Sequence, residues 1–292
     1  MDNLDFNNKE QFLDFFIKYA LMEDMGDGDH TSLACVGAED EDTAILLVKD
    51  EGILAGVELM EHIVKAVDPE ARINIFKRDG SYVQHGDIAF QIRCKSRALL
   101  LAERLVLNTM QRMSGVATTA RKYADEVKDY PVQILDTRKT MPLNRFLQKW
   151  AVQIGGCTNY RFGLFDRIMI KDNHVDASGG MRAAIERVQT YLKEKGKDLE
   201  ITVEVRDLEE LSLVMEYPIV NRVMLDNFSF EDMRTAVAQI NKQKEVEASG
   251  GITMETLQSV AATGVDFISV GALTHSAPSL DLSLKVRNEI SV

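Results

Sequence analysis

The 292-residue sequence lacks the features that mark several large classes of protein. No apolar run approaches the roughly 20 residues of a membrane-spanning helix, so no membrane segment is expected. The start of the chain, MDNLDFNNKEQF, is acidic and polar and is unlike a secretory signal. Lysine and arginine number 34 against 46 aspartate and glutamate, so the chain lacks the basic excess that general nucleic-acid binding needs. A formal net charge of -12 still allows a local cationic cluster that binds a small anion.

Cysteine is also scarce, and the histidines are isolated. Cys35, Cys94 and Cys157 are odd in number, widely spaced and without a Cys-x-x-Cys pair. This spacing favours reduced thiols in a cytoplasmic protein over a disulfide framework. The acidic segment 24–32 (DMGDGDHTS) fails the calcium-loop pattern, because its glycines are misplaced and the closing glutamate is missing. No metal-binding motif is therefore evident.

The pattern of predicted helices and strands changes part-way along the chain. An amphipathic helix is expected near the start of the chain. From Thr43 to about Cys94, short strands with glycine turns and one further helix predict a small α+β unit. Residues 96–130 predict a long helix with a possible break at Ser114-Gly115. After it, strand-like and helical segments alternate, which predicts a parallel sheet that is open or closed into a barrel. The expected strands, with the residues that follow them, are 132–139, 167–174, 201–207, 222–228, 245–251 and 266–273.

Each expected strand ends in polar residues or glycine. The residues at these ends are Arg138, Lys139, Lys171, Asp172, Asn173, His174, Glu204, Asp226, Asn227, Ser249, Gly250, Gly251 and Gly271. In an α/β barrel the C-terminal ends of the strands converge on one face. A single polar end could be an ordinary solvated loop, but the whole succession indicates an active site.

The content of this predicted site falls into three parts. Its cations suit carboxylates and phosphates, and they are Arg138, Lys139, Arg161 and Lys171. The segments ASGGIT and SVGA leave backbone N–H groups free to approach a phosphate near a helix N-terminus. Glu204 and Asp226 could hold ribose hydroxyls or a Mg²⁺ that a phosphate substrate brings. The sequence thus predicts one ligand with more than one carboxylate beside a second ligand with phosphates.

Several longer segments resemble the quinolinate phosphoribosyltransferase family, in order, from about residue 21 to 285. They include AERLVLNTMQRMSGVAT, DTRKTMPLNRFLQKWAVQIGGCTNYRFGLFDRIMIKDNH and EASGGIT. The resemblance implies an N-terminal α/β sandwich domain (1–115, completed by about 273–292) and an incomplete α/β barrel of about seven strands (116–272), in a homodimer. It also implies that the protein joins quinolinate to 5-phosphoribosyl 1-diphosphate with Mg²⁺. The products would be nicotinate mononucleotide, CO₂ and diphosphate, in NAD biosynthesis.

The resemblance implies substrate contacts for individual residues. Those expected to clamp the carboxylates of quinolinate are Arg138, Lys139 and Arg161. Further contacts are expected from Thr137, Tyr160 and, across the dimer interface, Arg104. Those expected to cradle the 5′-phosphate are Ser249, Gly250, Gly251, Gly271 and Ala272.

Four of the implied residues are expected to be catalytic. Lys139 and Lys171 would face the diphosphate and the reacting ring. Glu204 and Asp226 would lie near the ribose and would meet its Mg²⁺ indirectly, through the substrate.

One residue departs from the family pattern, which usually has histidine at the position of Tyr160. A tyrosine with an unperturbed pKa near 10 stays neutral at working pH, so we expect a neutral ring contact or a packing residue there. The departure leaves open a related phosphoribosyltransferase that acts on a different acidic ring. A Schiff-base aldolase that uses Lys171 is a second alternative, and a non-enzymatic dimer or scaffold is a third.

Overall fold

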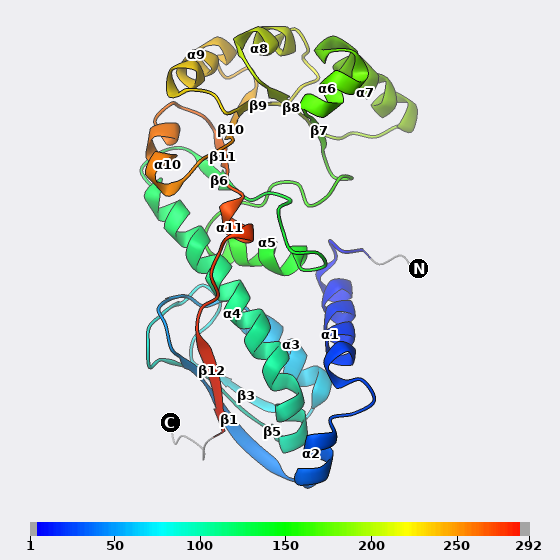
Figure 1. Cartoon of the computed structure of the whole chain (residues 1–292), viewed down its shortest axis with the longest axis vertical. Coiled ribbons are helices and arrows are strands. Elements are labelled where there is room, and N and C mark those ends of the chain that lie inside the picture. The colour runs from blue at the N-terminus through cyan, green and yellow to red at the C-terminus, as the bar shows by residue number, and fades with distance from the viewer. Residues whose placement is uncertain (1–4, 287–292) are drawn as a thin grey trace. The chain divides into compact units, whose positions relative to one another are not determined.

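The computed structural model describes residues 5–286, and the chain forms two compact units (Figure 1). The first unit takes the chain up to Arg121, residues 141–156 and the chain from Thr274 onward. The second unit takes Lys122–Thr140 and Cys157–Leu273. No helix among the described residues is both long enough and apolar enough to cross a membrane.

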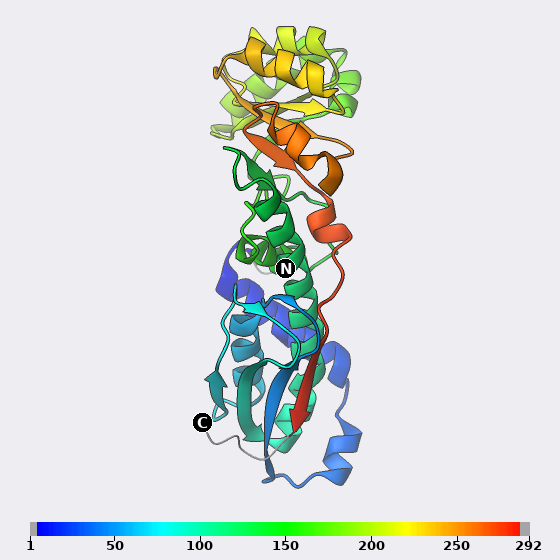
Figure 2. The same ribbon diagram turned by 90° about the vertical axis from the view of Figure 1, so that its left-hand side faces the viewer.

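The first unit is built on an antiparallel sheet with strand order β12-β1-β5-β3. Its strands are β1 (Glu41–Val48), β2 (Gly52–Ile53), β3 (Arg72–Ile75), β4 (Tyr82–Val83), β5 (Ile88–Lys95) and β12 (Leu282–Val286), with β2 and β4 paired separately. Its helices are α1 (Lys9–Met25), α2 (His30–Cys35), α3 (Val57–Val67), α5 (Arg145–Ile154) and most of α4 (Ser96–Glu126). Helices α3 and α4 lie on one side of the four-stranded sheet (Figures 1 and 2). The short helix α11 (Ala272–His275) falls where the chain passes between the units.

Helix α4 is continuous, so the possible break at Ser114-Gly115 is wrong. Both small residues serve close packing instead. The Ser114 hydroxyl accepts a hydrogen bond from the Ala55 N–H at 2.9 Å. A Cβ added to Gly115 would lie 1.7 Å from the Pro278 carbonyl oxygen, so only glycine fits there. The predicted domain boundary at residue 115 therefore falls within one helix.

Helix α5 belongs to the first unit, whereas the sequence had placed it with the barrel. Its aromatic and backbone contacts explain this. The Phe146 ring stacks on Phe12 of α1, with ring centroids 4.6 Å apart. At the end of α5, the Gly155 carbonyl accepts a hydrogen bond from the Arg121 side chain at 3.0 Å.

The second unit is a curved parallel sheet with helices outside it (Figure 1). In chain order its strands are β6 (Gln133–Leu135), β7 (Ile168–Ile170), β8 (Ile201–Val205), β9 (Arg222–Asp226), β10 (Glu245–Ser249) and β11 (Phe267–Ser269). The helices are α6 (Asp172–Ser178), α7 (Met181–Lys195), α8 (Leu208–Met215), α9 (Phe230–Ile240) and α10 (Met254–Ala261). All five residues of β8 are buried, as expected for a parallel strand covered on both faces.

Among the described residues the sheet has six strands, in the order β6-β11-β10-β9-β8-β7. The pattern of the sequence predicted these six, whereas the family resemblance implied about seven. Beyond β6, the backbone at Thr158 makes one parallel bridge to Leu135 instead of a full strand. The Thr158 N–H donates to the Ile134 carbonyl at 2.9 Å, and the Asp136 N–H donates to the Thr158 carbonyl at 3.1 Å. The predicted fold class, an α/β first domain and an incomplete barrel, is confirmed.

Candidate active site

The parallel register directs the predicted site residues to one face of the sheet. Side chains alternate between faces along a strand, and paired residues of neighbouring strands share a face. Ser249 pairs with Asp226, and Glu204 pairs with Met224, two residues before Asp226. Continuing the β7–β8 register beyond Ile170 places Lys171 beside Glu204. The same alternation, through the pairing of β11 with β6 and β10, places Thr137 and Gly271 on this face.

The opposite face of the sheet is apolar. Val203, Leu225 and Ala248 alternate with the polar residues, and none of the three is exposed. These side chains form the layer between the sheet and its covering helices, which leaves the polar set facing inward. The sequence placed these polar residues at the strand ends, and the register brings them together.

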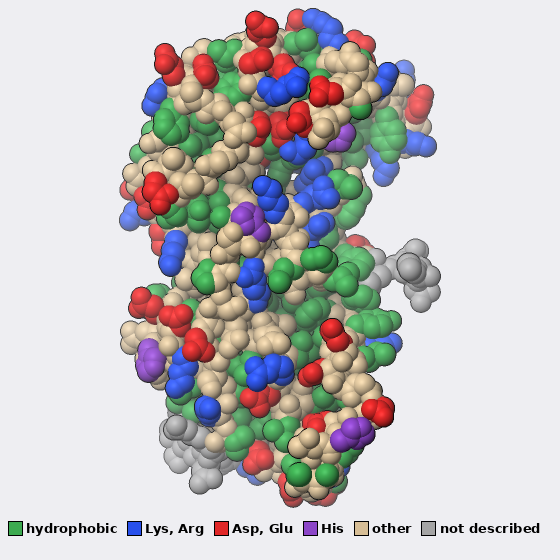
Figure 3. Space-filling model, in the orientation of Figure 1, with side chains coloured by type: hydrophobic (Ala, Val, Ile, Leu, Met, Phe, Trp, Pro, Cys, Tyr) green, Lys and Arg blue, Asp and Glu red, His purple; other side chains and the backbone are tan. Residues whose placement is uncertain are grey.

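A cavity of about 540 Å³ lies in the second unit beside β7. Three predicted cations from separate segments line it: Arg138 after β6, Arg161 before β7, and Lys171 at the end of β7. The Lys171 ammonium is 2.5 Å from a carboxylate oxygen of Glu204, which is only 8% exposed. In the space-filling view, lysine and arginine side chains gather around a recess in this unit (Figure 3).

The electrostatics of the cavity favour an anion. Burial, with the nearby positive charge of Arg138, lowers the pKa of Arg161 below the usual value for arginine. The guanidinium remains charged at working pH, because arginine titrates far above neutrality. Two guanidinium groups held together in a partly desolvated site are stabilised by a bound carboxylate or phosphate.

Backbone turns hold the cations in place. After β6, the Thr137 hydroxyl accepts a hydrogen bond from the Lys139 N–H at 3.1 Å. Asp136 is fully buried, and its carboxylate accepts a hydrogen bond from the Tyr160 N–H at 2.8 Å. This bond ties the segment that carries Arg161 to the end of β6. Sequence reasoning did not assign Asp136, although an acid directly after a buried strand was a visible signal.

The turn after β10 requires glycine. Gly250 has φ +93° and Gly251 has φ +58°, both in the left-handed region. A Cβ on Gly250 would lie 2.3 Å from the Asn227 side-chain oxygen. Asn227 in turn donates a hydrogen bond to the Asp226 carboxylate at 2.9 Å. The turn thus brings backbone close to the acid at the end of β9.

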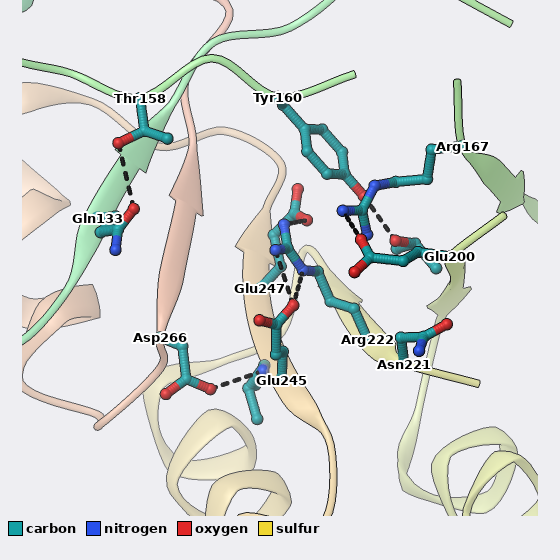
Figure 4. Close-up of polar contacts among 12 residues, drawn as sticks. Gln133, Thr158, Tyr160, Arg167, Glu200, Asn221, Arg222, Glu245, Glu247 and Asp266 are labelled. Carbon is teal, nitrogen blue, oxygen red and sulfur yellow. Dashed lines mark hydrogen bonds and ion pairs between the residues drawn. The ribbon is translucent and has the colours of Figure 1, made fainter. Parts of the chain in front are cut away.

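Beneath the strand ends, a buried polar cluster fills the barrel interior (Figure 4). The Tyr160 hydroxyl and the Thr202 hydroxyl are 2.6 Å apart and share a hydrogen bond. Arg222 lies 5.0 Å from the Tyr160 ring centroid and donates to the buried Glu247 carboxylate at 3.2 Å. Ser269 donates a second hydrogen bond to Glu247 at 2.5 Å.

Burial sets the ionisation of this cluster. It raises the pKa of Tyr160 to about 12, with the charge of Glu247 adding to the effect, so the phenol stays neutral. Burial also raises the pKa of Glu247, opposed by its bonds to Ser269 and Arg222. The polar cluster was not foreseen, because no local motif marks it. It accounts for the position of the Tyr160 side chain, while the expected contact of Tyr160 with a substrate ring stays a prediction.

Comparison with known proteins decides the family. The sequence model described as quinolinate phosphoribosyl transferase, C-terminal domain, matches residues 116–285, more than half of the chain. The corresponding N-terminal domain matches residues 29–114. The chain belongs to the quinolinate phosphoribosyltransferase family.

Individual family members resemble the chain over nearly its full length. A carboxylating nicotinate-nucleotide pyrophosphorylase of Arabidopsis thaliana is 43% identical over 291 residues, covering 94% of this chain and 83% of its own. A probable enzyme of the same name from Bacillus subtilis is 37% identical, covering 92% of each chain. The crystal structure of NadC from Streptococcus pyogenes has a TM-score of 0.88 at 33% identity, covering 94% of this chain and 97% of its own.

The structure places the remaining residues implied by the family as follows. Arg104 is exposed on α4, in the first unit, so its reach into a neighbouring site stays a prediction. Gly271 and Ala272 follow β11 directly. Among residues 5–286, no group of three or more His, Cys, Asp or Glu side chains could hold a metal ion.

Proposed function

We propose that the protein transfers the phosphoribosyl group of 5-phosphoribosyl 1-diphosphate to quinolinate and releases CO₂ and diphosphate. The chain is an enzyme of the quinolinate phosphoribosyltransferase family, which makes nicotinate mononucleotide for NAD biosynthesis. The observation that carries the proposal is the cavity at the barrel strand ends. There Arg138, Arg161 and Lys171 converge, and Glu204 lies against Lys171.

On the quinolinate side, Arg138 and Arg161 would each pair with a carboxylate. Arginine suits this role because its planar guanidinium can donate two parallel hydrogen bonds to one carboxylate. Lys139, on the turn held by Thr137, would add a third positive charge. The buried hydrogen bond from the Tyr160 N–H to Asp136 ties together the two segments that carry these arginines. Quinolinate bound in this way would direct its ring nitrogen toward the phosphoribosyl group.

On the phosphoribosyl side, Glu204 and Asp226 would accept hydrogen bonds from the ribose hydroxyls. Ser249 and the left-handed turn at Gly250 and Gly251 would hold the 5′-phosphate through backbone N–H groups. Gly271 and Ala272 would complete the cradle after β11. Mg²⁺ arriving with the diphosphate would be held near Glu204 and Asp226, where it would neutralise charge on the leaving group.

The reaction needs positioning more than acid or base catalysis. The pyridine nitrogen carries its own lone pair and attacks the ribose carbon without a general base, while the diphosphate leaves with the bonding electrons. Glu204 and Asp226 stabilise the positive charge that develops on the ribose. The resulting pyridinium accepts the electrons left by departing CO₂, and the ring carbon then takes a proton. Positioning of two reactants can contribute up to about 7–11 kcal/mol in favourable intramolecular models.

The homodimer and the trans role of Arg104 also belong to this proposal. The exposed position of Arg104 on α4 is compatible with contact to a second subunit. A cytoplasmic location is proposed on the cysteines alone, since Cys35, Cys94 and Cys157 are all free thiols.

The rival aldolase activity is disfavoured by one contact. A Schiff-base lysine attacks as a free amine. The Lys171 nitrogen is instead held by the Glu204 carboxylate at 2.5 Å. Borohydride trapping with carbonyl substrates would reveal an aldolase, and we expect no adduct on Lys171.

A direct assay tests the proposed function. Purified protein with Mg²⁺, quinolinate and 5-phosphoribosyl 1-diphosphate should produce nicotinate mononucleotide, with CO₂ in equal amount. Omitting either organic substrate should abolish the product. A folded, dimeric preparation that makes no nicotinate mononucleotide under these conditions would refute the proposal.

A further inference from the structure

Arg167 is a cation of the cavity that the mechanism above leaves unused. It lies in the loop directly before β7 and lines the same cavity as Arg138, Arg161 and Lys171. Its side chain is only 17% exposed. A largely buried charge is costly unless it is paired or hydrogen-bonded, so the groups around Arg167 decide how much positive charge reaches the cavity.

Two neighbours hold the Arg167 guanidinium. One terminal nitrogen pairs with a carboxylate oxygen of Glu200. The guanidinium carbon lies 5.3 Å from the centroid of the Tyr160 ring, within the range of a cation–π interaction (Figure 4). The other terminal nitrogen, Nη1, is buried and has no hydrogen-bond partner among residues 5–286. The side chain is thus fixed in the wall but not fully satisfied by protein groups.

Glu200 cancels this charge only weakly. Its side chain is 59% exposed, so water and salt screen the pair on the outer side. Tyr160, on the inner side, is neutral, because burial raises its pKa to about 12. The buried Glu247 also interacts electrostatically with Arg167, but its carboxyl group is bound by Arg222 and Ser269. The positive charge of Arg167 therefore adds to that of Arg138 and Arg161 in the cavity wall.

We propose that Arg167 is a specificity-determining residue whose charge favours an aromatic ligand with two adjacent carboxylates over one with a single carboxylate. This inference rests on the proposed function for the identity of the natural ligand. Arg167 acts by long-range electrostatic attraction across a partly desolvated wall, because it precedes β7 whereas Lys171 follows that strand. It complements the direct clamp by Arg138 and Arg161.

Calorimetric titration with phthalate tests the inference without any reaction, because phthalate has two adjacent carboxylates and no ring nitrogen. Arg167→Met keeps much of the apolar stem and removes the charge, and it should weaken phthalate binding about tenfold at low salt. Benzoate, with one carboxylate, should lose less than threefold, and the loss for phthalate should shrink as salt is raised. Arg167→Lys, which keeps the charge, should recover most of the affinity. The KM for quinolinate should rise in parallel with Arg167→Met, while the KM for 5-phosphoribosyl 1-diphosphate should stay within twofold.

Two further variants separate charge from structure. Glu200→Gln breaks the ion pair but leaves the charge of Arg167, so it should bind phthalate two- to threefold more tightly. Arg182→Met is the matched control, because Arg182 also pairs with an exposed glutamate, Glu216, but does not line the cavity. It should bind phthalate like the parent protein.

Several outcomes would overturn the inference. Equal losses for Arg167→Met and Glu200→Gln would assign Arg167 a purely structural role. Equal losses for phthalate and benzoate would remove the specificity claim. If Arg167→Met does not fold, unchanged or weaker binding by Glu200→Gln contradicts the inference by itself. Failure of the parent protein to turn over quinolinate would refute the proposed function instead. The phthalate titrations would still test the role of Arg167, because they need no reaction.

Discussion

Replacing Tyr160 by phenylalanine tests whether this residue acts through packing or through its hydroxyl. The change removes one hydrogen bond, the 2.6 Å contact with the Thr202 hydroxyl, and keeps the ring in contact with Arg167 and Arg222. One neutral hydrogen bond contributes about 0.5–1.5 kcal/mol net. Because Thr202 is fully buried, its hydroxyl would be left unsatisfied, so the free energy of unfolding should fall by about 1–3 kcal/mol.

The effect of Tyr160→Phe on catalysis should be smaller than that of losing the neighbouring arginine. If Tyr160 is a neutral packing residue, kcat/KM for quinolinate should fall by less than about 1.5 kcal/mol, close to tenfold. Arg161→Ala should cost about 3–5 kcal/mol, because it would leave a substrate carboxylate unpaired in a partly desolvated site. Steady-state kinetics with quinolinate and urea unfolding measure the two quantities on the same preparations.

A double-mutant cycle provides the control. Thr202→Val alone should destabilise the protein about as much as Tyr160→Phe, because it leaves the Tyr160 hydroxyl without its hydrogen-bond partner Thr202. The double variant should be more stable than the sum of the two losses indicates, since replacing both partners by apolar groups is nearly neutral. A catalytic loss for Tyr160→Phe as large as that of Arg161→Ala would refute the reasoning and give the hydroxyl an essential role.

Four further predictions follow from the same contacts. Nicotinate, which lacks one carboxylate, should have a lower kcat/KM than quinolinate, by about 1.5–3 kcal/mol for each charged hydrogen bond lost. Equal turnover of the two acids would contradict the binding of both carboxylates by Arg138 and Arg161. Gly250→Ala should raise the KM for 5-phosphoribosyl 1-diphosphate, whereas Gly264→Ala, at a similar φ of +92° against +93° for Gly250, should affect stability alone. Inactive Arg104→Ala and Arg138→Ala homodimers should regain activity on subunit exchange, and no recovery would argue against Arg104 acting in trans. The pKa of Tyr160 is near 10 in the unfolded chain and about 12 in the folded protein. The resulting contribution to the free energy of unfolding, about 2–3 kcal/mol, should be complete below pH 10 and lost as the pH rises toward 12. Alkaline unfolding curves of Tyr160→Phe should lack this loss.

The sequence by itself determined which site residues lie at or just after the ends of buried strands. Arg138 and Lys171 come after their strands, and Glu204, Asp226 and Ser249 lie within the last two residues of theirs. This pattern is visible in the sequence because a parallel strand is covered on both faces and is mostly apolar up to its end. The inward direction of these residues follows from the two-residue alternation once the strands are paired in parallel register. The same local pattern predicted the α/β class and a parallel sheet, open or closed, whereas the incomplete barrel was implied by the family resemblance.

Only the tertiary structure decided the contacts between distant segments. Nothing local joins Tyr160 to Thr202, which are 42 residues apart, or Arg222 to Glu247, which are 25 apart. These pairs meet because side chains from several strands of the curved sheet face the same interior. No local sequence motif marks the residues that face it. The unbroken helix α4 was misjudged for a related reason: its glycine at 115 serves a close approach by a segment near residue 278. The local sequence thus determined which groups lie at the strand ends, because hydrophobic periodicity is a property of neighbouring residues. Long-range packing determined which side chains contact them, because those contacts join residues that are far apart in the sequence.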